Sequence, residues 1–198
     1  GANVHDRTRA GWDALMIASR YGITEMVEQL LYRGADPKAA DKDGRTSMMQ
    51  AAERGHAKTV ELLINAHADR EARDKEGATA LIVAAGEGHT DVVETLVRHG
   101  AEVDAKDNLG ATALIWATGQ GRTETVEQLL ELGADPNVQD TDGVTALMEA
   151  VTTKNNNLIG TLLEHKADPA LKDSQGRTAA DIAKKQGNDE AAGLLAQR

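Results

Sequence analysis

The stretch DNLGATALIWATGQG, residues 107–121, decides the fold because its pattern returns at a fixed interval along the chain. Its opening phrase D-x-x-G occurs five times, and the five aspartates stand 33 residues apart, at Asp41, Asp74, Asp107, Asp140 and Asp173. A strict period of this length indicates stacked units, since one unit cannot bury its apolar face without a neighbour. The sequence therefore predicts an all-α repeat solenoid and not a pocketed globule.

Other positions keep the same register. A Thr follows each D-x-x-G glycine by two residues, and an apolar residue and a fixed Ala come after it, as at Thr112, Leu114 and Ala117. An apolar pair such as Leu129-Leu130 follows, and a Gly-Ala-Asp phrase closes the unit, as at residues 133–135. Each Asp is expected to accept N–H bonds across a tight turn, each Gly to take positive φ, and each Thr to cap a helix.

This register resembles the ankyrin repeat family, whose unit runs D-x-x-G-x-T-P-L-H-x-A-A-x-x-G-H, then V-x-L-L and G-A-D. The resemblance covers the whole chain. It implies a hairpin finger plus an antiparallel helix pair in every 33 residues. It also implies a concave face, formed by finger tips and first helices, on which the family generally docks other proteins.

The register sets the expected boundaries of the repeats. Residues 1–7 are expected to be the tail of a preceding, truncated repeat, and residues 173–198 a C-terminal capping repeat with a polar outer side. The exposed flank of the first repeat is expected to allow weak self-association of an otherwise monomeric chain. Full repeats are expected at residues 8–40, 41–73, 74–106 and 107–139, with a divergent one at 140–172.

The chain departs from the family pattern at three places. Ala or Ser replaces the family's Pro, and Met or Ile replaces its following His in the full repeats, which predicts a more apolar seam between repeats. Lys154 replaces the glycine between the two helices of the fifth repeat. Because a non-Gly residue held left-handed costs roughly 1 kcal/mol, we expect a reshaped loop at residues 154–157, with neutral drift as the simplest cause.

The acidic charge is concentrated in the middle of the chain. The formal net charge is −10, and residues 74–172 hold 7 basic against 17 acidic side chains. Such a field repels phosphate backbones and anionic lipid, and it attracts a basic protein surface. The alternative explanation of the charge is solubility alone. No apolar run is long enough to span a membrane and no signal peptide is visible, so a cytoplasmic location is the default expectation.

No pattern in the sequence indicates catalysis. The chain has no Cys, its serines lie outside any G-x-S-x-G turn, and its histidines lack the spacing of a zinc site. Acid pairs such as Asp41 with Asp43 are explained by turns and lack the ligand series of a calcium loop. We expect no enzyme activity, no metal and no cofactor.

Candidate binding residues follow from the register of the implied concave face. Trp12, Tyr21 and Trp116 are three of the four aromatic residues in the chain, and aromatic and Arg side chains dominate binding hot spots. The alternative is that each Trp is half-buried against neighbouring fingers. The complete candidate set is Arg9, Trp12, Ile17, Arg20, Tyr21, Arg45, Arg54, Val83, Glu87, Leu109, Trp116, Val144 and Glu149.

The sequence thus predicts a non-enzymatic scaffold that binds a partner protein or peptide, with a basic partner favoured over nucleic acid or membrane. One alternative is a targeting or scaffolding segment of a larger enzyme, channel or effector. Another is an engineered binder, although the framework varies between repeats, as in Met48 against Leu81, which favours a natural array.

Overall fold

A computed structural model of the chain describes residues 3–197, which form helices joined by loops and contain no strand within that range. Residues 1 and 2 of the predicted tail of a preceding repeat lie outside the described residues. The chain divides into two compact units, unit 1 (Gly1–Glu102) and unit 2 (Val103–Arg198). The helices are α1 (Ala14–Arg20), α2 (Thr24–Tyr32), α3 (Ser47–Glu53), α4 (Ala57–Asn65), α5 (Ala80–Glu87), α6 (Thr90–Arg98), α7 (Ala113–Gly119), α8 (Thr123–Glu131), α9 (Ala146–Thr152), α10 (Asn156–Glu164), α11 (Ala179–Lys185) and α12 (Asp189–Ala196).

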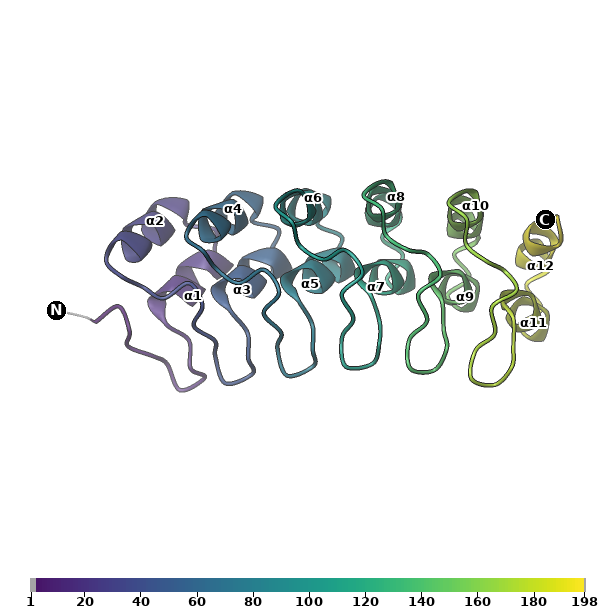
Figure 1. The fold of residues 1–198 in the computed structure, drawn as a ribbon, viewed down its shortest axis with the longest axis horizontal. Helices are drawn as coiled ribbons and strands as arrows, with labels where there is room; N and C mark the ends of the chain where they lie inside the picture. Colours follow the sequence, from purple (N-terminus) through teal and green to yellow (C-terminus); the bar gives the residue numbers. More distant parts are fainter. Residues whose placement is uncertain (1–2, 198) are drawn as a thin grey trace. The chain divides into compact units, whose positions relative to one another are not determined.

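Within each unit the helices form two rows, and finger loops project from the row of first helices (Figure 1). In unit 1, α3 packs against both α1 and α5, and α4 packs against both α2 and α6. In unit 2, α9 packs against both α7 and α11, and α10 contacts both α8 and α12. The predicted finger and antiparallel helix pair is therefore the observed repeating element.

The finger turns have the predicted chemistry. Asp140 Oδ1 accepts the backbone N–H groups of Asp142 at 2.9 Å and Val144 at 2.8 Å, and the other four D-x-x-G aspartates make the same pair of bonds. Gly143 has φ +74°, and a Cβ there would lie 2.9 Å from Cα of Asp173 in the next finger. Glycine is thus required both for the left-handed turn and for the close approach of fingers.

The predicted helix caps are also confirmed. The Thr145 hydroxyl accepts the N–H of Met148 at 3.2 Å, and the equivalent Thr side chains cap α3, α5, α7 and α11. Asp13 caps α1 in the same way. In α11 the carboxylate of Asp181 also accepts the N–H of Thr178, which completes a capping box.

The expectation of a reshaped loop at residues 154–157 is wrong. Lys154 has φ +57°, the left-handed conformation that glycine takes in the other repeats, for example at Gly121 with φ +67°. As a result α10 begins 33 residues after α8, in unbroken register. The roughly 1 kcal/mol cost of a left-handed lysine is smaller than the cost of disturbing helices packed on both sides.

The core consists of aliphatic side chains, as the lack of Phe requires. The first helices contribute buried Leu and Met residues such as Leu15, Met48, Leu114 and Leu147. The residues that replace the family's His are buried as well, so the predicted apolar seam is confirmed. Two histidines join adjacent repeats in unit 1, since His56 Nε2 lies 3.0 Å from the carbonyl oxygen of Arg20 and His89 Nε2 lies 2.9 Å from that of Glu53.

The first repeat leaves apolar surface uncovered on its outer side. Met26 of α2 is 47% exposed, whereas Thr59 and Val92 at the same register position are fully buried by the repeat before them. In the last repeat, Asp181, Lys184 and Lys185 of α11 are exposed. The self-association predicted for the first repeat and the capping role predicted for the last stay predictions.

Candidate functional site

The candidate residues lie on the finger loops and on the first helices of each unit, a surface that we call the finger face of that unit. Unit 1 contributes nine of them and unit 2 four, and we describe the two units separately. Two clusters of side-chain contacts occur on these faces, one around Trp12 in unit 1 and one around Trp116 in unit 2.

In unit 1 the indole of Trp12 is fixed from two sides. Its Nε1–H donates to Asp41 Oδ2 at 2.9 Å, and the guanidinium of Arg20 lies 5.5 Å from the ring centroid. Arg20 Nη1 also donates to Gln50 Oε1 and to Glu53 Oε2, both at 2.8 Å. The structure thus brings together two predicted residues, Trp12 and Arg20, and their contacts with Asp41, Gln50 and Glu53 fix both side chains.

A second guanidinium completes this cluster. Arg45 Nη2 lies 3.2 Å from Glu53 Oε2, so one carboxylate is shared by two arginines. The side chains of Arg20, Arg45 and Glu53 are each about three-quarters buried or more. Glu53 is therefore neutralised within unit 1, and Trp12 is half-buried as the alternative interpretation expected.

The remaining candidates of unit 1 have no such contacts. Ile17 and Tyr21 are 38% and 69% exposed, and Val83 is half-buried. Arg9, Arg54 and Glu87 are exposed, and among the described residues their side chains form no hydrogen bond or ion pair.

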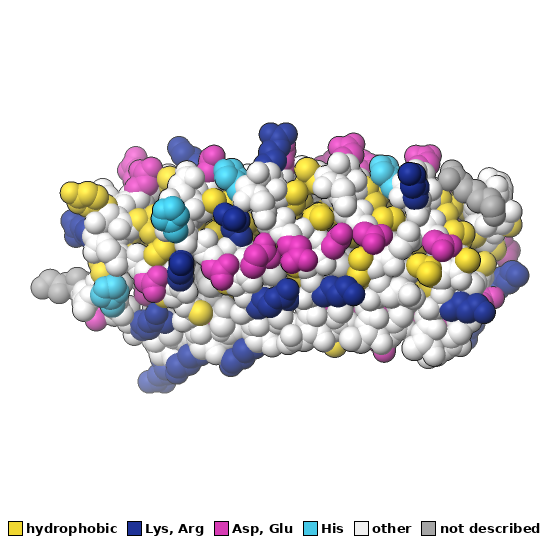
Figure 2. All heavy atoms as spheres, in the orientation of Figure 1, with side chains coloured by type: hydrophobic (Ala, Val, Ile, Leu, Met, Phe, Trp, Pro, Cys, Tyr) yellow, Lys and Arg dark blue, Asp and Glu magenta, His cyan; other side chains and the backbone are white. Residues whose placement is uncertain are grey.

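The fingertips differ in charge between the units. The residue after the turn aspartate, or after Thr8 in the first repeat, is Arg9, Lys42 or Lys75 in unit 1, and Asn108, Thr141 or Ser174 in unit 2. Figure 2 shows Lys and Arg side chains grouped along the lower edge of unit 1, where Figure 1 places the finger loops. The fingertips of unit 2 therefore place no positive charge at this position.

In unit 2 the indole of Trp116 is anchored within its own repeat. Its Nε1–H donates to Asp107 Oδ2 at 2.7 Å, while Asp107 Oδ1 holds the finger turn. Trp116 is nevertheless 38% exposed, and Leu109 on the same finger is 65% exposed. The polar edge of the indole is thus satisfied and an apolar ring face is left on the surface.

Glu149, on α9, is the second notable side chain of this cluster. It lies against α7, since a Cβ on Gly119 would come within 2.9 Å of its Oε1. Burial, and secondarily the negative charge of Asp140, raise the pKa of the Glu149 carboxyl above its ordinary value. Among the described residues no cation pairs with Glu149, in contrast to Glu53. Val144, the other candidate of this repeat, is half-buried.

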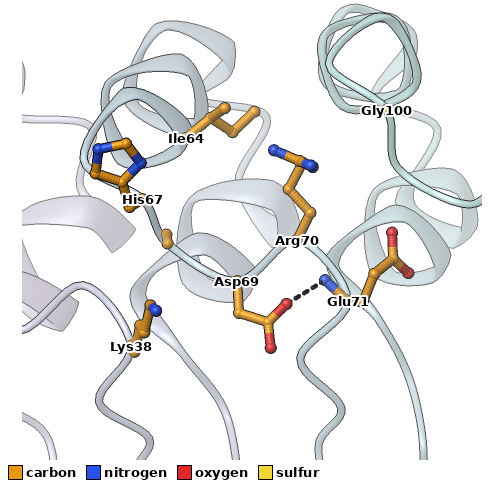
Figure 3. Close-up of a pocket in the computed structure, with 8 residues that line it drawn as sticks. Lys38, Ile64, His67, Asp69, Arg70, Glu71 and Gly100 are labelled. Atoms are coloured by element: carbon orange, nitrogen blue, oxygen red, sulfur yellow. Dashed lines mark hydrogen bonds between the residues drawn. The ribbon is translucent and has the colours of Figure 1, made fainter.

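A separate hollow of about 350 Å³ lies in unit 1 among the loops that follow the second helices (Figure 3). His67, Arg70 and Lys38 line it together with Asp69 and Glu71, and Asp69 Oδ1 accepts the N–H of Glu71 at 2.9 Å. The hollow is lined by both acidic and basic side chains, and its carboxylates already accept hydrogen bonds from backbone N–H groups. Glu71 Oε1, for example, accepts the N–H of Glu102 at 2.8 Å. We assign loop packing, and no ligand, to this hollow.

Several residues outside the predicted candidate set lie in the two clusters. Asp41 and Asp107 were assigned to turns alone, yet their outer oxygens position the two indoles. Gly119 carried no prediction. The signal for it is the register: Arg20 and Gly119 stand 99 residues apart, three repeats, as do Gln50 and Glu149.

A family model for ankyrin repeats, which spans three copies, matches residues 1–74, 48–140 and 123–198. The chain belongs to the ankyrin repeat family. Ankyrin repeats are generally protein–protein interaction modules and are generally non-enzymatic. No protein among the curated sequences compared matches this ankyrin chain.

Two observations bear on the classes of site that this ankyrin array offers. Among residues 3–197, no helix has both the length and the apolar run that a membrane crossing requires. Within the same range, no three His, Asp or Glu side chains converge as metal ligands would. The two clusters on the finger faces, at Trp12 and at Trp116, are the candidate protein-binding sites.

Proposed function

We propose that this ankyrin array is a non-enzymatic binding module whose partner protein or peptide docks on the finger face. The family's general role in protein interaction supports the proposal. A scaffold of packed helices supports it too, because a preorganised surface loses little conformational entropy on binding.

The observation that carries the proposal is the distribution of exposed apolar side chains. Seven large hydrophobic residues are exposed in the described chain, and four of them, Ile17, Tyr21, Leu109 and Trp116, lie on the finger face. Aromatic and long apolar side chains on a rigid surface are the usual anchors of protein interfaces. The other three lie in the first repeat, at or next to α2.

Charge supports a basic partner. The chain carries a net charge of −10, and an opposite charge on the partner accelerates encounter and excludes like-charged competitors. Nucleic acid is disfavoured as a partner for the same reason.

The test is affinity capture from a lysate followed by mass spectrometry and a binding titration with the recovered protein. The native chain is compared with a Tyr21→Ala, Trp116→Ala double variant. The matched control is Tyr32→Ala, because Tyr32 is 94% exposed but lies on α2, outside the finger face. We expect a protein retained by the native chain and the control, with Kd at least about 30-fold weaker for the double variant. Identical retention by all three chains would show that the finger face is passive.

A further inference from the structure

In unit 1 the finger face already binds a guanidinium, that of the chain's own Arg20. The guanidinium carbon of Arg20 lies over the Trp12 ring, 5.5 Å from its centroid, and Arg20 donates to Gln50 and Glu53 at 2.8 Å each. The site combines an aromatic ring with oxygen acceptors from the next repeat. These are the two features that a planar, five-donor cation prefers.

Unit 2 keeps part of this framework without the arginine: three repeats later Asp140 stands at the position of Asp41, whereas Ala111 and Thr152 replace Trp12 and Glu53, and Trp116 offers an indole from the position of Ile17. The position of Arg20 is occupied by Gly119 three repeats later, so no side chain extends from it. The position of Gln50, whose Oε1 accepts from Arg20, is occupied by Glu149, whose Oε1 lies against Gly119. A neutral acceptor has thus become a carboxylate beside a residue that has no side chain.

The acids around Gly119 have unused acceptor capacity. The outer oxygens of Asp41, Asp107 and Asp173 accept from Trp12, Trp116 and Arg177 respectively. In the described residues no equivalent donor reaches Oδ2 of Asp74 or of Asp140, nor the carboxylate of Glu149, and of these acids Asp140 and Glu149 lie in unit 2. Glu149 is half-buried and accessible from the finger face.

Trp116 supplies the aromatic component. It stands three residues before Gly119, one helical turn away on α7, and Asp107 fixes its indole. Its exposed ring and the exposed Leu109, on the finger of the same repeat, are apolar surface of the helix α7 and its finger, and Glu149 lies against α7 at Gly119. A cation over such a ring gains both ring-quadrupole attraction and shielding from water.

We propose that this part of unit 2, formed by Trp116, Gly119, Asp140 and Glu149, binds an arginine side chain of the partner. The inference rests on the proposed function and specifies the chemistry of the partner on the finger face. Arginine is favoured over lysine because a planar guanidinium can face an indole and still donate to a carboxylate through its edge. Arg20 makes both kinds of contact at once, with Trp12 and with Glu53.

Two electrostatic observations agree with this assignment. Burial and the charge of Asp140 raise the pKa of Glu149, which means that its ionised form lacks compensation in the free protein. The fingertips of unit 2 carry Asn108, Thr141 and Ser174 and so do not repel a cation. A bound guanidinium supplies the missing positive charge.

The probe for this site is the peptide acetyl-Ala-Arg-Ala-amide, compared with versions that carry citrulline or lysine in place of arginine. Citrulline keeps the planar shape and loses the charge. Binding is followed through the two indole N–H signals in ¹H–¹⁵N spectra, since Trp12 and Trp116 are the only tryptophans. We expect the arginine peptide to move the Trp116 signal at tens of millimolar concentration and to leave the Trp12 signal in place. A cation over the ring (about 0.5–2 kcal/mol) plus one exposed ion pair (up to about 1 kcal/mol) gives a Kd of roughly 6 mM or weaker.

Three variants sharpen the test. Glu149→Gln is expected to weaken binding about tenfold or more, as removal of one charged acceptor should. Gly119→Arg is expected to abolish it, because the new side chain can pair with Glu149 as Arg20 pairs with Gln50 in unit 1, and the flexible end of Glu149 can move to accommodate it. Glu164→Gln on α10, an exposed acid, is the matched control and should bind like the native chain. Circular dichroism establishes that each variant keeps its helices.

Several results would overturn the assignment. Equal binding of the citrulline peptide, or unchanged binding to Glu149→Gln, would show that no ion pair with Glu149 forms. Equal binding of the lysine peptide would show that the site does not prefer arginine. No movement of the Trp116 signal up to about 300 mM peptide would show that this part of unit 2 does not bind arginine, because an attraction of about 1–3 kcal/mol gives substantial occupancy at that concentration. The proposed function is judged separately: a captured protein that needs Tyr21 and Trp116 but binds Glu149→Gln normally would support the finger face while refuting arginine recognition.

Discussion

One register position shows how much a single residue decides on this surface. Gln50 and Glu149 stand at the same place in their repeats, yet Gln50 is fully buried and bonded to Arg20, whereas Glu149 is half-buried without a cationic partner. The difference follows from the residue opposite, which is Arg20 in one case and Gly119 in the other. A partly buried carboxylate without a cationic partner lowers the free energy of unfolding, because its charge loses hydration that no partner replaces.

Replacement of Glu149 by Gln is therefore expected to stabilise the chain at neutral pH. The folded-state pKa of Glu149 is raised, so folding favours the protonated acid, and the native chain loses stability as pH rises from the ordinary pKa near about 4.3 through the raised value. The gain from Glu149→Gln should be fully present above that window and should shrink towards zero below it. Urea unfolding midpoints at a series of pH values from 3.5 to 7.5, a range of about four pH units around the window, measure this difference.

Glu164→Gln serves again as the control, and its midpoint should follow that of the native chain at every pH. A Glu149→Gln variant less stable than the native chain at pH 7 would show that the carboxylate has a stabilising partner in solution.

Helices of this chain begin and end at positions that the repeat period sets. The Thr caps, the turn aspartates and the left-handed residues recur at the same offsets in both units. Where another residue replaces glycine at one of these positions, the loop keeps its conformation and the replacing residue adopts the strained left-handed φ. His67, Lys154 and Lys166 are the three non-glycine residues with positive φ among those described.

Lys154→Gly is expected to raise the free energy of unfolding by up to about 1 kcal/mol. Relief of the left-handed strain, about 1–2 kcal/mol, is partly offset by the larger entropy of glycine in the unfolded chain. Lys184→Gly, an exposed site inside α11, is the matched control and should lose about 1 kcal/mol. Denaturant midpoints of the two variants should thus move in opposite directions, and a loss at both positions would mean that Lys154 makes a stabilising contact.

The turns and helix starts could be predicted from the sequence because Asp, Gly and Thr each act locally. The Asp and Thr side chains bond backbone N–H groups two to four residues away, and Gly takes the left-handed φ of the turn. The sequence was insufficient at Lys154, where packing of α9 and α10 against neighbouring helices outweighs local preference. The site was harder to predict. Trp12, Arg20, Trp116 and Glu149 could each be placed on the finger face, but whether each is paired depends on side chains up to 33 residues away, such as Glu53 for Arg20.

At the scale of the molecule, stability in a repeat array is a sum over neighbouring contacts. Inside unit 2, α10 contacts α8, α9 and α12, whereas α12 contacts α10 and α11. An element with fewer packed neighbours opens locally at a lower free energy.

Backbone amides of α12 are accordingly expected to exchange with solvent at least about tenfold faster than those of α10, a difference of about 1.4 kcal/mol in opening free energy. Hydrogen exchange followed by mass spectrometry resolves the two helices. Equal protection of α12 and α10 would mean that unit 2 opens only as a whole.

Gly119 has one more consequence, which concerns how such a surface can change over generations. Every glycine codon becomes an arginine codon by one base substitution, and the position lies on the accessible side of α7, away from the buried leucines of the core. A point mutation can therefore close the proposed arginine site with the chain's own side chain, and its reversal can open the site again. Recognition at this place can be gained or lost in a single mutational step without any change to the fold.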